Sequence, residues 1–250
     1  MREIDALDGL MGRVTDAAGI HFKMLNSSKG PAVRGPRAQA DRDLYKAEMQ
    51  SIIFNYDNLT VLEASAEDLV LAEPIDSTNK NKAKVLGLKT ADGRVVEAPA
   101  VVLTTGTFLR GRCHIGRTSF SAGRQLRDSD GVEPPSIGLA LTLDRLGFAL
   151  GRMKTGTPPR LLKSTIDWDK LVKQSSDMPP PAFSYLSHEK GVKLIDSLID
   201  CAQTETNENT HHLVMKHADL LPSYDGAGGG GVGPRYCPSL FKKVQRFPDR

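Results

Sequence analysis

The cysteine in the segment GPRYCPS is the residue with the clearest chemical potential. Cys237 follows Arg235 and Tyr236 and stands directly before Pro238, after a run of glycines that ends at Gly233. A thiol is nucleophilic only as the thiolate, and both a nearby guanidinium and the backbone N–H groups of a turn favour that form. The segment therefore predicts a reactive thiol. A small buried side chain is the alternative that this context leaves open.

The glycine cluster before this cysteine has the spacing of a phosphate-binding loop, but its surroundings do not fit one. Gly226, Gly228 and Gly231 match the pattern G-x-G-x-x-G. A dinucleotide-binding loop of this kind needs a strand before it and a helix after it. Pro222 precedes the cluster and Pro234 follows it closely, so we interpret it as a flexible loop.

The histidines and cysteines do not form a recognisable metal-binding pattern. Their spacing matches none of the usual zinc motifs, so polar loop histidines are the preferred interpretation and no metal site is predicted. The residues considered are Cys201, His211, His212 and His217. Cys113 and His114 are adjacent in sequence, and on a strand they would point to opposite faces, which argues against a catalytic pair.

The first part of the chain is rich in arginine. Guanidinium groups make forked contacts with phosphate, so a face that carries several of them could bind a polyanion. Ordinary solvated surface charge is the alternative. The arginines concerned are Arg34, Arg37, Arg110, Arg112, Arg117, Arg124 and Arg127. The formal net charge of +3 permits a polyanionic partner without requiring one.

The elements that must position these residues follow from apolar periodicity and turn signals. Apolar residues recur at helical spacing from Ile4 to Ala18, which predicts one helix that ends at Gly19. A loop broken by Gly and Pro is expected at 26–42, with a helix over about 38–53. Four short strands are expected after this helix, at 59–64, 67–73, 83–90 and 94–106. A hairpin turn at 91–93 is expected between the third and the fourth.

The last run ends in the best candidate for a ligand-facing strand. Residues 100–106, AVVLTTG, are apolar without interruption before two threonines and a glycine. Such a run is typical of a buried parallel strand whose carboxyl end opens onto a ligand, so a binding crevice is expected at Thr105, Gly106 and Thr107.

A further amphipathic helix is expected between the proline pair of PPSI and Gly147. Ser136 is placed to cap it, and Ile137, Leu141 and Leu146 are expected to face the core. After Arg152 the sequence pattern changes to one typical of loops and short strands, which predicts a domain boundary near residue 150.

The composition is that of a soluble globular protein with one large domain or two modest ones: 250 residues, 39% hydrophobic and 25% charged. Three cysteines without a CxxC spacing favour a reducing compartment over a disulfide framework. No signal segment is recognised and no apolar run is long enough to span a membrane. The chain reaches a ligand-facing strand only near residue 100, so it is expected to be the middle of a longer protein.

Six segments together resemble one family, and they occur in the same order. The segments are MREIDALDGLMG, KGPAVRGPRAQADR, LTTGTFLRG, PPSIGLA, GRMKTGTPPR and GPRYCPS. They are similar to the MnmG/GidA family, flavin-dependent enzymes that modify the wobble uridine of certain tRNAs, and most similar to its mitochondrial branch. The resemblance extends over essentially the whole chain.

This resemblance implies an α/β fold that is part of a glutathione-reductase-type FAD-binding fold with an inserted NAD(P)-binding-like domain. Residues 1–151 would be a partial FAD-binding domain that lacks the N-terminal GxGxxG unit. Residues 152–250 would be part of the inserted NAD-binding-like domain. The truncated chain alone is expected to be inactive and not to hold FAD tightly, because the pyrophosphate would lack its Gly-rich turn and helix N-terminus.

The resemblance also implies site residues. The thiol considered catalytic in the family falls on Cys237, and its FAD contacts fall on Ala66 and Ser136, beside the strand end at Thr105, Gly106 and Thr107. The segment associated with NAD runs from Gly233 to Phe247. Its named members are Gly233, Pro234, Arg235, Tyr236, Pro238, Ser239 and Phe247.

The activity implied by the resemblance joins a one-carbon unit from methylenetetrahydrofolate and an amine, glycine or taurine, to C5 of uridine. FAD reduced by NADH, a partner GTPase of the MnmE type, a homodimer and a mitochondrial location belong to the same expectation. Cys237 would act as nucleophile at C6 or as a proton carrier. The alternatives are a non-catalytic tRNA-binding or interaction module and a general FAD-dependent oxidoreductase.

Overall fold

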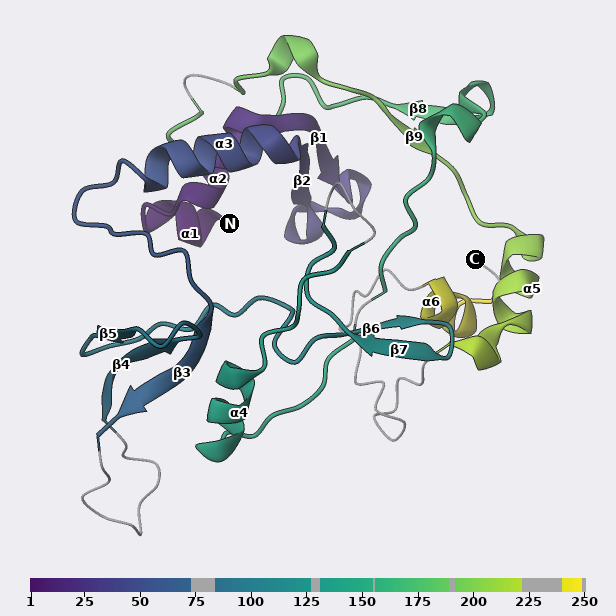
Figure 1. The fold of residues 1–250 in the computed structure, drawn as a ribbon. Coiled ribbons are helices and arrows are strands. Elements are labelled where there is room, and N and C mark those ends of the chain that lie inside the picture. Colours follow the sequence, from purple (N-terminus) through teal and green to yellow (C-terminus); the bar gives the residue numbers. More distant parts are fainter. Residues whose placement is uncertain (73–83, 127–130, 155, 189–191, 222–239, 249–250) are drawn as a thin grey trace. The chain divides into compact units, whose positions relative to one another are not determined.

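The computed structural model describes residues 1–72, 84–126, 131–154, 156–188, 192–221 and 240–248 (Figure 1). They form short helices and short strands, which confirms the mixed helix and strand content of the expected class. The chain divides into two compact units, each made of two separate stretches: Met1–Leu62 with Leu161–Glu205 in unit 1, and Glu63–Arg160 with Thr206–Arg250 in unit 2. None of the helices in the described ranges is long and apolar enough to cross a membrane.

Unit 1 consists of two short helices, a hairpin, a longer helix and a return segment of short turns and strands. In its first stretch the bounds are α1 Arg2–Ala6, α2 Leu10–Ala18, β1 Gly19–Leu25, η1 Ser27–Lys29, η2 Pro31–Val33, β2 Gly35–Ala40 and α3 Arg42–Ile53. In its second stretch they are η4 Lys163–Thr165, η5 Trp168–Lys170, β8 Val172–Gln174, η6 Ile195–Ser197 and β9 Cys201–Gln203. β1 pairs with β2, and β8 with β9, both antiparallel.

The single helix expected between Ile4 and Ala18 is interrupted at residues 7–9, so this prediction is wrong in that respect. Asp8 adopts the left-handed backbone conformation, with φ of 63°. A side chain at Gly9 would overlap Ile4. Asp tolerates the left-handed region better than most residues and glycine alone fits the close approach, so this pair separates α1 from α2. The second helix ends at Ala18, as expected.

The loop expected at 26–42 contains the strand β2, which forms a hairpin with β1. The helix expected from about residue 38 therefore begins later, at Arg42. Asp41 fixes this start, because its carboxylate accepts the N–H groups of Asp43 and Leu44 at 2.9 and 3.0 Å. The strand was missed because its sequence, GPRAQA, has a Gly-Pro pair and little apolar character.

The core of unit 1 is small and joins its two stretches. Phe22 on β1 is fully buried and packs against Phe183, with ring centroids 6.4 Å apart. Val192 completes the buried cluster, and Ala38 and Leu198 pack against it. Aromatic side chains dominate a core of this size because each buries a large area.

Buried carboxylates hold the return segment against the first helices. Asp16 on α2 is 2% exposed and accepts the N–H groups of Phe183 and Ser184 at 2.8 and 2.9 Å. Asp5 on α1 accepts the N–H group of Tyr185 at 2.9 Å. Three successive backbone donors of one loop are thereby satisfied by side chains more than 160 residues away in sequence.

A further link connects β1 to the loop that follows β8. Asp177 donates its N–H group to the Phe22 carbonyl at 2.9 Å, and its carboxylate accepts from Lys23 Nζ at 2.6 Å and from the Met24 N–H group at 2.7 Å. The bond from Lys23, followed by that from Met24, lowers the pKa of Asp177. Strand and loop are thus joined by main-chain and charged contacts together.

The described residues of unit 2 form a three-stranded antiparallel sheet, a separate hairpin, three α-helices and a 3-10 turn. The sheet order is β3-β4-β5, and β6 pairs with β7. The bounds are β3 Ala66–Leu71, β4 Val85–Thr90, β5 Val95–Glu97, β6 Arg112–Ile115, β7 Thr118–Ser121, α4 Gly138–Arg145, α5 Glu208–Lys216, η7 Ala218–Leu220 and α6 Leu240–Arg246.

The strands predicted between residues 59 and 106 are correct in the middle of this range and wrong at both ends. The turn at 91–93 lies between β4 and β5, with Gly93 at φ of 87°. The runs at 59–64 and 100–106 form no strand. An apolar run becomes a parallel strand only where neighbouring strands bond to its edges, and every strand pair among the described residues is antiparallel and excludes both runs.

We expect Asp16→Ala to destabilise unit 1 by about 2–4 kcal/mol, because two buried N–H groups would lose their acceptor. Urea unfolding monitored by circular dichroism would measure the change. Asp169→Ala, on an exposed 3-10 turn, is the matched control and should change stability by less than about 0.5 kcal/mol. Equal effects of the two substitutions would contradict the role assigned to Asp16.

Candidate functional site

Two of the segments predicted to contact a cofactor lie side by side in unit 2. The N–H group of Ser136 donates to the Phe108 carbonyl at 3.2 Å, and the Arg110 N–H group donates to the Ser136 carbonyl at 2.8 Å. The residues that directly follow the 105–107 loop therefore pair with the segment that precedes α4. Gly106 has φ of 64°, so the loop turns sharply there.

The third predicted segment, around Ala66, meets the same helix from the sheet. Ala66 is half-buried and begins β3, opposite Thr90 of β4. A side chain at Gly138 would overlap the carboxylate of Glu67, so the first turn of α4 rests against the first residues of β3. Segments that are far apart in sequence thus converge on the start of α4.

A polar cluster fixes α4 against β3. Asp68 accepts from Thr142 Oγ1 at 2.5 Å and from Arg145 Nη2 at 2.9 Å. Burial opposes the charge on Asp68, but the bonds from Thr142, the Leu69 N–H group and Arg145 outweigh it, so the pKa of Asp68 is lowered. This network, which the sequence does not reveal, aligns the helix whose first turn carries the predicted site.

Two expectations for α4 are wrong. Ser136 does not cap the helix, because the N-cap position is Ile137 and no side chain bonds to the first turn. Ile137 and Leu141 are half exposed, whereas Leu139 and Thr142 are buried. The helix begins one residue later than a cap at Ser136 would place it, and its packing on Asp68 selects the Thr142 face.

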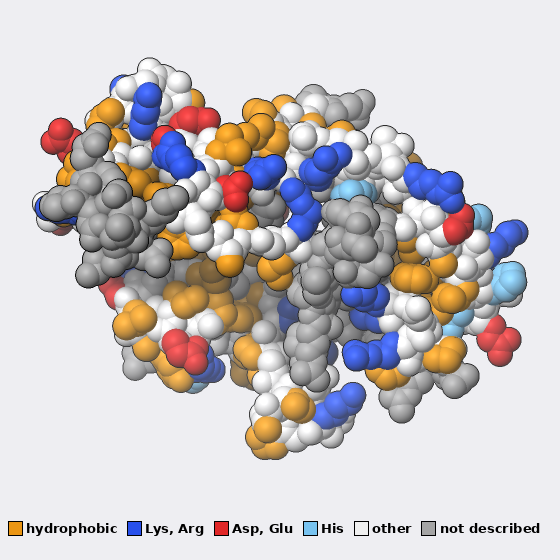
Figure 2. All heavy atoms as spheres, turned by 90° about the horizontal axis from the view of Figure 1, so that it is seen from below, with side chains coloured by type: hydrophobic (Ala, Val, Ile, Leu, Met, Phe, Trp, Pro, Cys, Tyr) orange, Lys and Arg blue, Asp and Glu red, His pale blue; other side chains and the backbone are white. Residues whose placement is uncertain are grey.

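The apolar run at 101–105, expected to be a buried strand, is largely at the surface. Val102 is 86% exposed and Leu103 is 39% exposed. Thr105, Gly106 and Thr107 are exposed as well. Hydrophobic side chains are also at the surface elsewhere on the face drawn in Figure 2. The described residues alone do not bury this run, so it remains available for further packing.

The predicted catalytic residue lies outside the described residues. Cys237 belongs to residues 222–239, together with Gly233, Pro234, Arg235, Tyr236, Pro238 and Ser239. The glycine cluster at 226–231 and Arg127 also lie outside the described residues. Phe247, the last residue of the predicted NAD-associated segment, follows α6 and is 48% exposed. Its N–H group donates to the Lys243 carbonyl at 2.8 Å.

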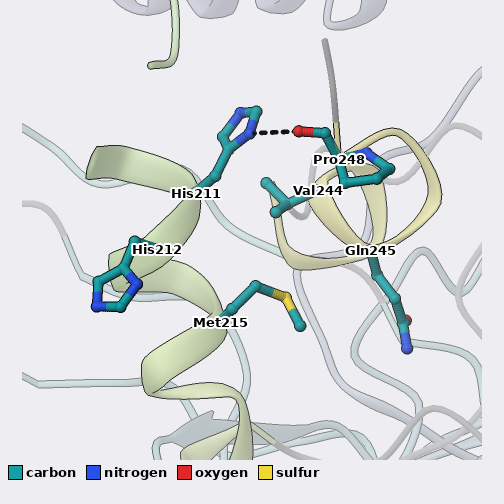
Figure 3. A pocket seen from close by; sticks show the side chains of 6 residues that line it. All are labelled: His211, His212, Met215, Val244, Gln245 and Pro248. Carbon is teal, nitrogen blue, oxygen red and sulfur yellow. Dashed lines mark hydrogen bonds between the residues drawn. The ribbon is translucent and has the colours of Figure 1, made fainter. Parts of the chain in front are cut away.

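A pocket of about 340 Å³ lies between α5 and α6 (Figure 3). It is lined by His211, His212, Met215, Val244, Gln245 and Pro248. Met215 points toward α6, and the His212 ring lies farther from it. The pocket is adjacent to Phe247 in sequence, and its lining is mainly apolar.

His211 joins the two helices of this pocket. Its Nδ1 lies 3.1 Å from the Pro248 carbonyl oxygen and its Nε2 lies 3.0 Å from Thr206 Oγ1. A carbonyl only accepts, so Nδ1 carries the proton of the neutral ring and Nε2 accepts from the hydroxyl. Asn207 caps α5 by accepting the Thr210 N–H group at 2.9 Å. The histidines at 211 and 212, interpreted as loop residues, are helical.

The arginines singled out by sequence fall into two groups in unit 2. Arg117 pairs with Asp219 and Arg124 pairs with Glu133, at 2.9 and 2.6 Å. Arg110 and Arg112 have no acidic partner in the part of the chain that the structure describes. Arg34 and Arg37 belong to unit 1.

Arg112 and His114 lie on the same face of β6, because alternate residues of a strand share a face. Arg112 Nη2 donates to Ser119 Oγ at 2.7 Å. Burial lowers the pKa of His114, and the charges of Lys154, Arg112 and Arg152 lower it further. Cys113 and His114 are consecutive on β6 and so point to opposite faces, as expected. Sequence reasoning had set His114 aside, although the alternation Arg-x-His was a usable signal.

Within the described ranges, no three His, Cys, Asp or Glu side chains are grouped so as to hold a metal ion. Cys113 and Cys201 are free thiols. Gln39 Nε2 lies 3.1 Å from Cys201 Sγ, which places this cysteine in unit 1 beside β2.

Comparison with known proteins identifies the family of the chain. The model of the family described as "Glucose inhibited division protein A" matches residues 1–250, and the chain belongs to this family. The resemblance noted from the sequence is therefore confirmed.

Two relatives are 48% identical over all 250 residues. They are "tRNA uridine 5-carboxymethylaminomethyl modification enzyme MnmG" of Granulibacter bethesdensis and "5-taurinomethyluridine-[tRNA] synthase subunit MTO1, mitochondrial" of Pongo abelii. The chain covers 37% of the first and 34% of the second. It matches the crystal structure titled "Structure of Aquifex aeolicus GidA in the form I crystal" with a TM-score of 0.78 and 40% identity, over 39% of that chain. The chain thus spans little more than a third of its relatives.

We expect Thr142→Val to lower stability by about 1 kcal/mol, because Asp68 would lose one of its donors. The pKa of Asp68 would rise toward its ordinary value, which carboxyl NMR titration would detect. A carboxylate with a lowered pKa stabilises the fold above its unfolded pKa and loses this contribution as the pH falls through its folded pKa. The stability difference between variant and wild type should therefore begin to shrink near about pH 4 and close at lower pH. Thr118→Val on β7 is the control. An unchanged Asp68 titration in Thr142→Val would contradict the network.

We expect His211→Leu to weaken the attachment of α6 to α5, with a loss of about 1–2 kcal/mol, because the Pro248 carbonyl and Thr206 hydroxyl would lose their partner. Hydrogen exchange of the α6 amides would report faster opening. His212→Leu, one position away and exposed, is the control and should leave exchange unchanged. Similar exchange in both variants would show that His211 does not carry this contact.

Proposed function

We propose that this chain is part of a FAD-dependent enzyme that modifies the wobble uridine of tRNA at C5. The observation that carries the proposal is the match of the whole chain, at 48% identity, to two relatives whose names specify tRNA uridine modification. The convergence of the Ala66, 105–107 and Ser136 segments on the start of α4 gives the proposal a structural basis.

The residues present fit a flavin site in part. Exposed backbone at Gly106 and the apolar run at 101–105 suit a planar, largely apolar ring, and Ala66 and Ser136 would contact the cofactor from the sheet and from the turn before α4. FAD, when bound, supplies the redox chemistry, with NADH as its reductant. We also propose that residues 1–151 are part of an FAD-binding domain and residues 152–250 part of an NAD-binding-like domain. The two compact units described above are defined differently, by contacts within the structure.

Cys237 is assigned the role of the group that activates the base. Addition of its thiolate to C6 of uridine would move electron density to C5, which would then bond to the one-carbon unit of methylenetetrahydrofolate. The bond from that carbon to the folate nitrogen would break, and the nitrogen of the amine would take its place, which releases tetrahydrofolate. Loss of the C5 proton and departure of the thiolate would restore the ring. A thiol that only carries that proton is the alternative role, and Arg235 would favour the thiolate in either case.

The partners in this proposal are tRNA, a GTPase of the MnmE type and a second copy of the full-length protein. A mitochondrial location is supported by the names of three relatives, from Pongo abelii, Macaca fascicularis and Mus musculus. The bacterial relative shows that the family is not restricted to mitochondria. Whether glycine or taurine is the amine follows from the modified nucleoside formed.

The proposal is tested by incubating the full-length protein with its GTPase, tRNA, NADH, the folate donor and each amine, followed by mass spectrometry of the nucleosides. We expect Cys237→Ser to reduce modification by more than about a thousandfold, because a hydroxyl is a far weaker nucleophile at neutral pH. Cys113→Ser and Cys201→Ser are the controls and should retain activity. NADH oxidation without any change in tRNA would instead support a general oxidoreductase.

We expect the 250-residue chain on its own to purify without the visible absorbance of bound flavin, because it lacks a Gly-rich pyrophosphate turn in a strand-turn-helix context. The full-length protein prepared in parallel should be yellow. Absorbance spectra of both proteins before and after addition of FAD provide the measurement. Retention of flavin by the isolated chain would contradict this expectation.

A further inference from the structure

The hairpin β6–β7 presents positive charge that the described part of the chain does not neutralise. Arg112 and Arg152 are exposed and form no ion pair with any described carboxylate. Arg117, in the turn of the same hairpin, and Arg124 and Arg145, outside it, each contact an acidic side chain within 3 Å. The difference between the two sets is therefore local and is not a general feature of the unit.

Arg112 of this hairpin and Arg152, which follows α4 along the chain, are held in place by neutral groups. Arg112 donates to Ser119 Oγ at 2.7 Å, and Arg152 Nη1 donates to the Arg110 carbonyl oxygen at 3.2 Å. Ser119 lies directly opposite His114 in the β6–β7 register, so hydroxyl, imidazole and guanidinium share one face. Neutral partners orient a guanidinium without cancelling its charge, which leaves its remaining donors available.

The charged groups that act on His114 are all positive. They are Lys154, Arg112 and Arg152. Holding several cations together costs free energy through mutual repulsion, which an anion would relieve. A phosphate group fits because it accepts several N–H bonds at once and suits the forked geometry of arginine.

We propose that the face of β6–β7 formed by Arg112, His114 and Ser119, with Arg152 and Lys154 beside it, binds a phosphodiester of the RNA backbone. This inference rests on the proposed function for the identity of the RNA. Phosphate contacts of this kind set the position of an RNA on a protein without reading its sequence. The site would therefore hold the tRNA while other residues select the uridine.

The first test measures the affinity of the full chain for tRNA over a range of salt concentrations. Each lost phosphate contact should make the negative slope of log affinity against log salt shallower by about 0.7–0.9. It should also weaken binding about tenfold at low salt. We expect this result for Arg112→Ala and for Arg152→Ala. Arg124→Ala, an arginine already paired with Glu133, is the matched control and should keep the wild-type slope. Arg112→Lys should restore the slope because it restores the charge.

A second measurement follows the ring of His114 by NMR, with His114→Gln used for assignment. Bound RNA should raise the pKa of His114, because an anion stabilises the imidazolium. NADH and inorganic phosphate are tested separately. A response of His114 to NADH but not to RNA would assign the cluster to a cofactor and overturn the proposal. Identical salt slopes in all variants, or tRNA binding without salt dependence, would also overturn it.

These measurements require no cofactor, folate or GTPase, so their failure would count against the phosphate site alone. Failure of the full-length protein to modify uridine would count against the proposed function instead. Melting temperatures and circular dichroism spectra of each variant, compared with those of Arg124→Ala, separate a lost contact from a lost fold.

Discussion

Unit 1 depends on side-chain acceptors that satisfy the backbone of a loop distant in sequence. Its buried apolar cluster is small, and hydrophobic burial of this extent cannot by itself fix the position of a long return segment. Asp16 and Asp5 supply what the apolar contacts lack, because a buried N–H group without an acceptor is costly and a single geometry satisfies each one. Directional polar contacts thus determine how the two stretches of this unit meet.

The same reasoning explains which elements could be predicted from the sequence. The end of α2 at Ala18, the strands β3 and β4 and the turn at 91–93 follow from local patterns and agree with the structure. The break at Asp8 and the face of α4 that is buried do not. Both depend on contacts that periodicity does not contain: a close backbone approach at Gly9 and the Asp68–Thr142 bond.

The strand expected at 100–106 is the most informative error. The composition of the run was interpreted correctly as apolar, but a parallel strand is defined by its neighbours as well as by its own residues. Among the candidate site residues, Ser136 and the 105–107 loop were predicted from the sequence and stay predictions, whereas the cluster around His114 emerged only when strand register brought its members to one face. Sequence motifs can therefore predict which residues do chemistry, whereas the pairing register of strands is needed to predict which charged side chains share a face.

The discontinuity of unit 1 has a consequence for synthesis on the ribosome. Its first 62 residues leave the exit tunnel well before the loop at 183–185 that its carboxylates must bind. At cellular elongation rates the interval is on the order of ten seconds, long compared with the time in which helices and hairpins form. During that interval Asp16 and Phe22 lack their native partners, so nascent chains should depend on chaperone protection until the return segment emerges.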